Sequence, residues 1–131
     1  MLDGVRKIKA WQLADRLVIE AYRVTKGFPR EEIYGLTSQM RWCAVSVPAN
    51  IVEGSLRKNL KEYAQFLYIA MGSLGELEYY FHLAKELGYL TDKQHKTCDP
   101  LREETGKTLF GLIRWVEEQI NKDKKTKCDL A

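Results

Sequence analysis

The segment from Gln39 to Arg57, QMRWCAVSVPANIVEGSLR, constrains the fold more than any other part of the chain. It has the length of a helix, and between Gln39 and Val52 its only charged residue is Arg41. Pro48 lies in its middle, where a proline costs an ordinary helix roughly 3 kcal/mol. At about 100° per residue, two sides of this helix are apolar. The segment is therefore expected to be buried from several directions, which predicts an assembly.

A third side of this helix, called the polar seam below, carries small hydrogen-bonding residues where a solvated face would carry Lys and Glu. Its members have the spacing of coiled-coil contact positions: Gln39, Cys43, Ser46, Asn50, Glu53 and Arg57. One interpretation of Asn50 and Glu53 is a polar ligand site, and the favoured one is a network that fixes the geometry of assembly. A buried Glu53 needs a cationic partner, for which Arg57 or Arg41 is available. We therefore predict that Ser46, Pro48, Asn50 and Glu53 are structural residues of an oligomer.

The whole chain has the size of one globular domain. Its 131 residues are 45% apolar, so we expect a helical domain over residues 1–120 and a basic, flexible tail over 121–131. The net charge of +3 is compatible with nucleic-acid binding but is far from that of a dedicated basic tail. Three cysteines without CxxC spacing indicate reduced thiols. The absence of a signal core and of a long apolar span predicts a cytoplasmic protein with no membrane partner.

Four helical segments and no strands are expected, over about residues 8–26, 37–57, 59–87 and 91–119. One face of the first segment groups Trp11, Val18, Tyr22 and Thr25. Asn59 is the expected N-cap of the third segment, and Thr91 with Gln94 forms a capping box for the fourth. Pro100 is expected to kink or restart the fourth. Short links between long helices predict an all-α, antiparallel, up-down-up-down four-helix bundle.

Two glycines inside the third segment point to an interface. Gly72 and Gly75 each destabilise a helix by roughly 1 kcal/mol relative to alanine. The expected reason for their presence is the close approach of another backbone. The alternative is that they only weaken a marginally stable helix. The second and third segments each have a second apolar side that the bundle does not need. Leftover apolar surface marks an interface, and closed symmetric oligomers are its common form. We therefore expect a ring-like oligomer built through these two helices.

No pattern in the chain predicts catalysis. A di-metal site in a four-helix bundle needs two Glu-x-x-His pairs, and the chain has only His82 and His95. No spacing selects Cys43 or Cys98 as a nucleophile, and a buried structural cysteine is the default. The run from Gly72 to Gly75 lies within a helix, so its amides cannot form a phosphate loop. We therefore expect no enzyme activity, no metal and no cofactor.

Basic residues gather in three stretches, residues 6–9, 57–61 and 122–127. An antiparallel bundle would place all three at one end, and a ring would repeat them around it. The candidate nucleic-acid-binding residues are Arg41, Arg57, Lys58, Lys61, Lys122, Lys124 and Lys125. Ordinary solvated helix ends explain such clusters equally well. Lysines near a helix C-terminus also interact favourably with the negative end of the helix dipole. The favoured hypothesis is a scaffold that binds RNA or DNA; the alternative is a protein–protein interaction module without nucleic-acid binding.

Several motifs are similar to those of a known bacterial family. They are Trp11-Gln12, Phe28-Pro29, Tyr34-Gly35-Leu36, the run from Gln39 to Gly54 with its VPANIVEG core, and Leu87-Gly88-Tyr89-Leu90. Over roughly residues 7–116 the chain resembles the four-helix bundle proteins, also called the large-subunit rRNA intervening-sequence protein family. The resemblance implies a non-enzymatic homopentamer, and a distant similarity extends to the accessory variability proteins of diversity-generating retroelements, which are basic pentamers. This chain has Trp42 where the family tends to have a second basic residue.

Overall fold

The computed structural model describes residues 1–130, and these residues form helices and links without a strand. Four long helices make up most of the chain: α2 (Lys9–Thr25), α3 (Leu36–Ser55), α4 (Leu60–Glu86) and α5 (Asp92–Leu130). Two short ones precede α2 and α3, namely α1 (Leu2–Val5) and the 3-10 helix η1 (Arg30–Glu32). The predicted all-α class is confirmed.

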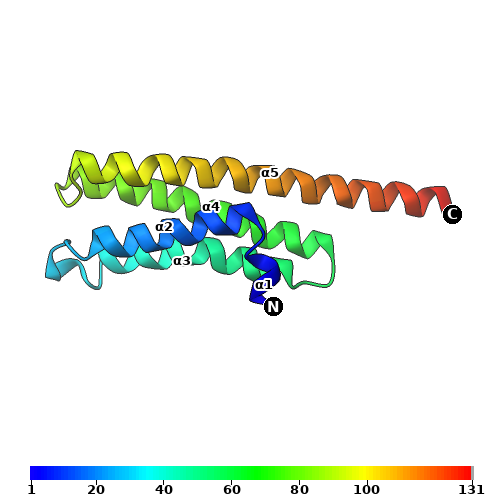
Figure 1. Cartoon of the computed structure of the whole chain (residues 1–131), viewed down its shortest axis with the longest axis horizontal. Coiled ribbons are helices and arrows are strands. Elements are labelled where there is room, and N and C mark those ends of the chain that lie inside the picture. The colour runs from blue at the N-terminus through cyan, green and yellow to red at the C-terminus, as the bar shows by residue number, and fades with distance from the viewer. Residues whose placement is uncertain (131) are drawn as a thin grey trace.

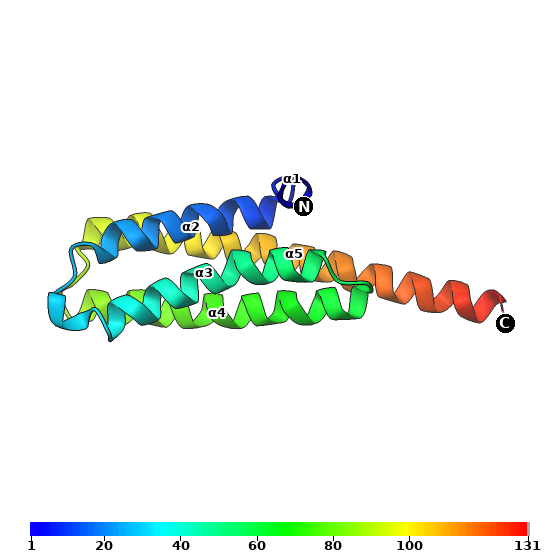
Figure 2. The same ribbon diagram turned by 90° about the horizontal axis from the view of Figure 1, so that it is seen from below.

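The long helices lie side by side in an elongated bundle (Figure 1). Each of α3 and α5 packs against both α2 and α4. The links that contain η1 and that join α4 to α5 share one end, called the η1 end, where the Phe28 and Tyr89 ring centroids are 5.4 Å apart. The link between α3 and α4 lies at the other end (Figure 2).

Two helix starts follow the capping chemistry that the sequence predicts. The Asn59 side chain accepts a hydrogen bond from the backbone N–H of Glu62 at 2.9 Å. At the start of α5, Thr91 Oγ1 accepts from the Gln94 N–H at 3.1 Å, and Gln94 Oε1 accepts from the Thr91 N–H at 2.9 Å. These bonds satisfy backbone donors that a helix N-terminus leaves unpaired.

Both prolines in the long helices are accommodated without a break. α3 continues through the buried Pro48, and α5 continues through Pro100. The expectation that Pro100 restarts its helix is therefore wrong. Pro100 lies in the third turn of a 39-residue helix, and packing of the following turns outweighs one missing backbone hydrogen bond.

The core runs along the bundle and is built from one stripe of each long helix. In α4 the buried stripe runs from Leu67 to Ala84 at helical spacing, and Phe81 is fully buried. In α2 the buried face is rotated away from the predicted one, because Tyr22 is exposed and Trp11 is only half-buried. The buried residues of α2 are smaller: Ala10, Leu13, Ala14, Leu17, Ala21, Val24 and Thr25. Small side chains allow α2 to approach α3 and α5 closely, while the larger aromatic rings remain at the edge.

The last helix extends beyond its predicted end. The sequence predicts a helix to about residue 119, whereas α5 continues to Leu130 and projects past the other helices (Figures 1 and 2). The flexibility of residues 121–131 stays a prediction. The segment contains neither Gly nor Pro and is rich in lysine, a good helix former. Residues 121–130 are all exposed, so their helicity comes from continuation of α5 and not from packing. Ala131 lies outside the described residues.

Candidate nucleic-acid interface

One end of the bundle collects part of the predicted basic set. Beside the link between α3 and α4, a hollow of about 270 Å³ lies between α4 and α5. Lys61 from α4 and Lys124 from α5 line it, together with Lys127 and one carboxylate, Asp123. We call this hollow and the adjoining α3–α4 link the basic end. The structure therefore brings together lysines from two helices that are far apart in the sequence.

Arg57 and Lys58, the two basic residues of the link, differ in whether an acidic side chain pairs with them. Arg57 forms an ion pair with Glu53 one turn earlier, and its guanidinium carbon lies 4.6 Å from the centre of the Phe66 ring. Arg57 is one of the two cationic partners that the sequence predicts for Glu53. Glu53 is exposed, however, and not buried. Lys58 is exposed at the tip of the link. Lys58 is thus the better placed of the two to neutralise a phosphate.

The other tail lysines lie on the exposed continuation of α5. Lys122 and Lys125 are fully solvated, but neither lines the hollow that Lys124 shares with Lys61. At about 100° per residue, Lys122 lies on nearly the opposite side of α5 from Lys124. The tail lysines therefore surround the projecting helix and do not form one patch.

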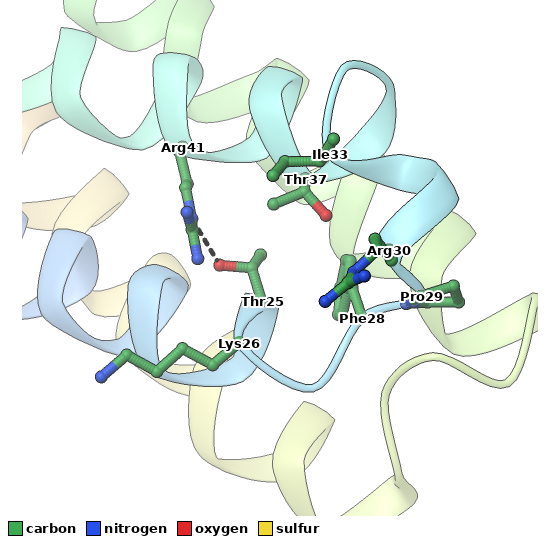
Figure 3. A pocket seen from close by; sticks show the side chains of 8 residues that line it. All are labelled: Thr25, Lys26, Phe28, Pro29, Arg30, Ile33, Thr37 and Arg41. Atoms are coloured by element: carbon green, nitrogen blue, oxygen red, sulfur yellow. Dashed lines mark hydrogen bonds between the residues drawn. The ribbon is translucent and has the colours of Figure 1, made fainter.

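Arg41 is separated from the rest of the predicted basic set. It lies near the η1 end, where its Nε–H donates a hydrogen bond to Thr25 Oγ1 at 2.8 Å (Figure 3). Its guanidinium carbon lies 4.7 Å from the centre of the Tyr22 ring. Arg41 therefore lies apart from the link between α3 and α4, because Arg41 and Arg57 lie towards opposite ends of α3. Its role in binding nucleic acid stays a prediction.

The middle of the polar seam of α3 is hydrogen-bonded within the chain. Ser46 and Ser73 of α4 have hydroxyl oxygens 2.8 Å apart, and Asn50 Nδ2 donates to both the backbone carbonyl and the hydroxyl of Ser46. One turn earlier the Cys43 thiol donates to Glu76 of α4, with sulfur and oxygen 3.5 Å apart. The seam thus joins α3 to α4.

The glycines divide into two kinds. Gly72 and Gly75 are exposed on α4, and a Cβ at either position would meet nothing within 4 Å in the described chain. A Cβ at Gly54, in contrast, would lie 2.9 Å from Phe66 Cβ and 3.2 Å from the Tyr63 carbonyl oxygen. Sequence reasoning missed Gly54 as the site of close approach between α3 and α4. Its position in the last turn of an apolar helix, opposite the start of α4, was the available signal.

Apolar side chains are exposed on the outer faces of α3 and α4. Trp42 is 78% exposed on α3, and Tyr68, Ile69 and Tyr79 are each about half exposed on α4. The Tyr68 hydroxyl donates a hydrogen bond to Glu117 at 2.8 Å. Gly72 and Gly75 lie between Tyr68 and Tyr79, so this face of α4 is apolar and locally flat. These are the leftover surfaces that the sequence predicts for the two middle helices.

Neither of the two buried thiols is an activated nucleophile. Burial raises the pKa of Cys43 to about 12, and the hydrogen bond and negative charge of Glu76 act in the same direction. Burial also raises the pKa of Cys98 to about 11, with smaller contributions from the charges of Glu20 and Asp99. Both thiols are therefore protonated at neutral pH, whereas a nucleophilic cysteine needs a lowered pKa. Within residues 1–130, no three acidic, histidine or cysteine side chains cluster as a metal site would require.

The all-helical bundle with a basic end places the chain among helical-bundle proteins. The chain belongs to the 23S rRNA-intervening sequence protein family, whose model matches residues 6–111. Among the helices described, none combines the length and apolar character that crossing a membrane requires. The distant similarity to accessory variability proteins stays a prediction.

The fold is also found among solved structures. One is the crystal structure of a protein of unknown function from the S23 ribosomal protein family of Bacteroides thetaiotaomicron, with a TM-score of 0.74 and 20% sequence identity. The similarity covers 79% of this chain and 97% of that one. No match was found among the curated proteins.

Proposed function

We propose that this chain is a non-enzymatic, cytoplasmic scaffold that binds RNA, or another nucleic acid, through its basic end. The observation that carries the proposal is the shared hollow that brings Lys61 of α4 beside Lys124 and Lys127 of α5. Ammonium groups from two elements on one concave surface can neutralise neighbouring phosphates, and counterion release then drives binding. The family description, which names a 23S rRNA-intervening sequence, favours RNA as the nucleic acid.

We further infer that the four long helices run antiparallel, up-down-up-down, and that copies of the bundle associate through α3 and α4 into a ring-like homopentamer. The half-exposed Tyr68, Ile69 and Tyr79 on the outer face of α4 support this part of the proposal, since soluble proteins rarely leave such surface uncovered. A ring would repeat the basic end around its axis. The local positive potential would then exceed what a net charge of +3 per chain provides.

Salt-dependent binding to fragments of 23S rRNA tests the nucleic-acid part. Fluorescence anisotropy at low ionic strength should show binding, and the logarithm of the association constant should fall linearly with the logarithm of salt concentration. The double variant Lys61→Gln/Lys124→Gln should weaken binding and reduce the salt slope by about 1 for each phosphate that is no longer neutralised. The matched control is Lys93→Gln/Lys96→Gln, which removes the same charge at the η1 end. Absence of binding at low salt would overturn the proposal, and so would an equal weakening of binding in both variants.

A second candidate function is a protein–protein interaction module without nucleic-acid binding. The half-exposed Tyr68, Ile69 and Tyr79 favour it, because aromatic residues are enriched where proteins bind one another. This candidate predicts that affinity capture from the native cell returns one defined protein after nuclease treatment. Loss of all captured material on nuclease treatment would favour the scaffold instead.

A further inference from the structure

A second charged hollow lies at the η1 end, and the proposed scaffold function makes no use of it. Lys26, Arg30 and Arg41 border a cavity of about 360 Å³, and no carboxylate lines it (Figure 3). None of the ion pairs found among residues 1–130 uses these three cations. These three cations therefore have no ion-pair partner among the described residues, so they can pair with a bound anion.

The geometry of the cavity is set by Arg41. The hydrogen bond from its Nε–H to the buried Thr25 and its position over the Tyr22 ring hold the guanidinium in place. Because only Nε is engaged there, the two terminal NH₂ groups remain available to a ligand. Figure 3 shows the Arg30 guanidinium pointing into the hollow from the η1 side, with Lys26 along its edge. Two planar guanidinium groups facing one space suit the oxygens of a phosphate.

The first turn of α3 borders the same region. Thr37 lines the cavity and Ser38 lines the adjoining one, so residues of this first turn border both. The N-cap of α3 is Gly35, and the Glu32 carboxylate already lies close to it. A 20-residue helix places the positive end of its dipole here. The dipole adds to the positive potential beside Arg41, while the two arginines remain the groups that select the phosphate.

An apolar and aromatic hollow continues from the charged one. It has a volume of about 300 Å³, shares Arg41 and Thr37 with the first, and extends along α3 to Trp42. Trp42 is 78% exposed, and its indole has no role in the core. An exposed indole next to a phosphate site offers a surface on which an unpaired base can stack.

We propose that these two adjoining hollows bind one nucleotide, with its phosphate between Arg41 and Arg30 and its base against Trp42. The site lies at the end of the bundle opposite the basic end, so it does not rest on the proposed scaffold function. A free mononucleotide and a nucleotide within a single strand share this chemistry. The test below distinguishes these two sources.

Titration of the full-length protein with AMP, adenosine and inorganic phosphate, followed by calorimetry and by NMR shifts, tests the site. AMP should bind, and adenosine should bind at least about tenfold more weakly because it lacks the charged hydrogen-bonding group. Arg30→Gln should weaken AMP binding by about tenfold for the same reason, and Arg41→Gln should do so at least equally. Arg30 is exposed and unpaired, so its variant keeps the test valid even if loss of the Arg41–Thr25 bond disturbs folding. Trp42→Leu should weaken AMP but leave inorganic phosphate unchanged.

Matched controls separate the site from general electrostatics and from the basic end. Lys93→Gln/Lys96→Gln removes charge at the same end outside the hollows, and Trp115→Leu removes another exposed indole; neither should change AMP binding. Lys61→Gln/Lys124→Gln should also leave it unchanged, so failure of RNA binding and failure of this site give different results. In the Lys61→Gln/Lys124→Gln background, a single-stranded oligoadenylate that binds more tightly than AMP and depends on Arg30 and Trp42 would identify a strand as the ligand. The reverse order of affinities would identify the mononucleotide. No AMP binding at millimolar concentration, or binding insensitive to Arg30 and Trp42, would overturn the proposal.

Discussion

The hydroxyl oxygens of Ser46 on α3 and Ser73 on α4 lie 2.8 Å apart, midway along the most extensive helix pairing in the bundle. Asn50 donates to the Ser46 hydroxyl at 2.9 Å and to the Ser46 carbonyl at 2.7 Å. Each of these polar groups is half-buried and has a partner. The polar seam therefore sets the register of α3 against α4 within a single chain.

A double-mutant cycle on Ser46→Ala and Ser73→Ala should reveal this coupling. We expect the two substitutions to be non-additive by about 0.5–1.5 kcal/mol in free energy of unfolding, because either one alone breaks the shared hydrogen bond. Urea denaturation monitored by circular dichroism provides the measurement. The matched cycle pairs Ser73→Ala with Ser38→Ala, an exposed serine on the same helix as Ser46, and should be additive. Additivity in both cycles would show that the Ser46–Ser73 bond does not stabilise the fold.

Gly54→Ala should destabilise the protein by about 1–3 kcal/mol, the range for overpacking a close contact. The added methyl group would lie 2.9 Å from Phe66 Cβ and 3.2 Å from a backbone oxygen of α4, which cannot move aside as a flexible side chain can. Thermal and urea unfolding measure the effect. Gly111→Ala is the control, because a Cβ there meets nothing within 4 Å; it should stabilise α5 by up to about 1 kcal/mol. A neutral or stabilising Gly54→Ala would contradict the close approach of α3 and α4.

The sequence predicts most of the fold because its signals are local. Capping residues such as Asn59 and Thr91 mark helix starts through bonds to amides three residues away, and these bonds form irrespective of the rest of the bundle. The apolar stripe of α4 has a clear period, so its buried residues from Leu67 to Ala84 follow from the spacing alone. The predicted bounds of the four long helices agree with the structure to within a few residues, apart from the C-terminal extension of α5.

What the sequence could not supply depends on contacts between helices. Side-chain size favours Trp11 and Tyr22 as core residues, but α2 buries its alanines because close helix packing favours small residues. The spacing of the seam favours an oligomer contact, whereas its partner is Ser73 of the same chain. The charged hollow at the η1 end joins Lys26, Arg30 and Arg41 from three elements. No linear motif connects those positions.

The three cysteines should differ sharply in reactivity towards thiol reagents. Cys128 is exposed near the end of α5, while Cys43 and Cys98 are buried and have pKa values raised to about 12 and about 11. Because only the thiolate reacts, one thiol per chain should be modified rapidly at pH 8 in the native protein and three in urea. Mass spectrometry of the alkylated protein identifies the site. Rapid native modification of Cys43 would contradict its burial against α4.

The raised pKa of Cys43 also predicts how stability changes in alkaline solution. Above the ordinary value of 9.0 the unfolded chain releases the thiol proton, while the folded chain keeps it up to about pH 12. The contribution of Cys43 is therefore complete below pH 9 and falls as the pH rises, by at most about 1.4 kcal/mol per unit. Unfolding free energies of the native protein and of Cys43→Ala should converge between about pH 9 and 10.5. Cys128→Ala is the exposed control, and its free energy of unfolding should change with pH in the same way as that of the native protein.

Gly72 and Gly75 test whether α4 contacts another copy of the chain. Within one chain, both positions have open space above them, so Gly72→Leu/Gly75→Leu should preserve or raise helix stability because leucine is the better helix former. If α4 lies against a neighbouring bundle, the same side chains would occupy the space of that neighbour. We therefore expect light scattering after gel filtration to give five times the 15.2 kDa chain mass for the native protein and the single-chain mass for the variant.

Gly111→Leu supplies the matched control, since Gly111 is also exposed inside a long helix but lies on α5, outside the proposed interface. It should leave the mass unchanged. Circular dichroism must show both variants fully helical, because open space at all three positions leaves the individual bundle free of clashes. A native protein that elutes at 15.2 kDa would exclude the ring, and a double variant that keeps the native mass would exclude α4 as its contact surface. Dissociation of the double variant with retained helicity would separate the assembly from the fold, because the same glycines would then be dispensable within the chain and required between chains.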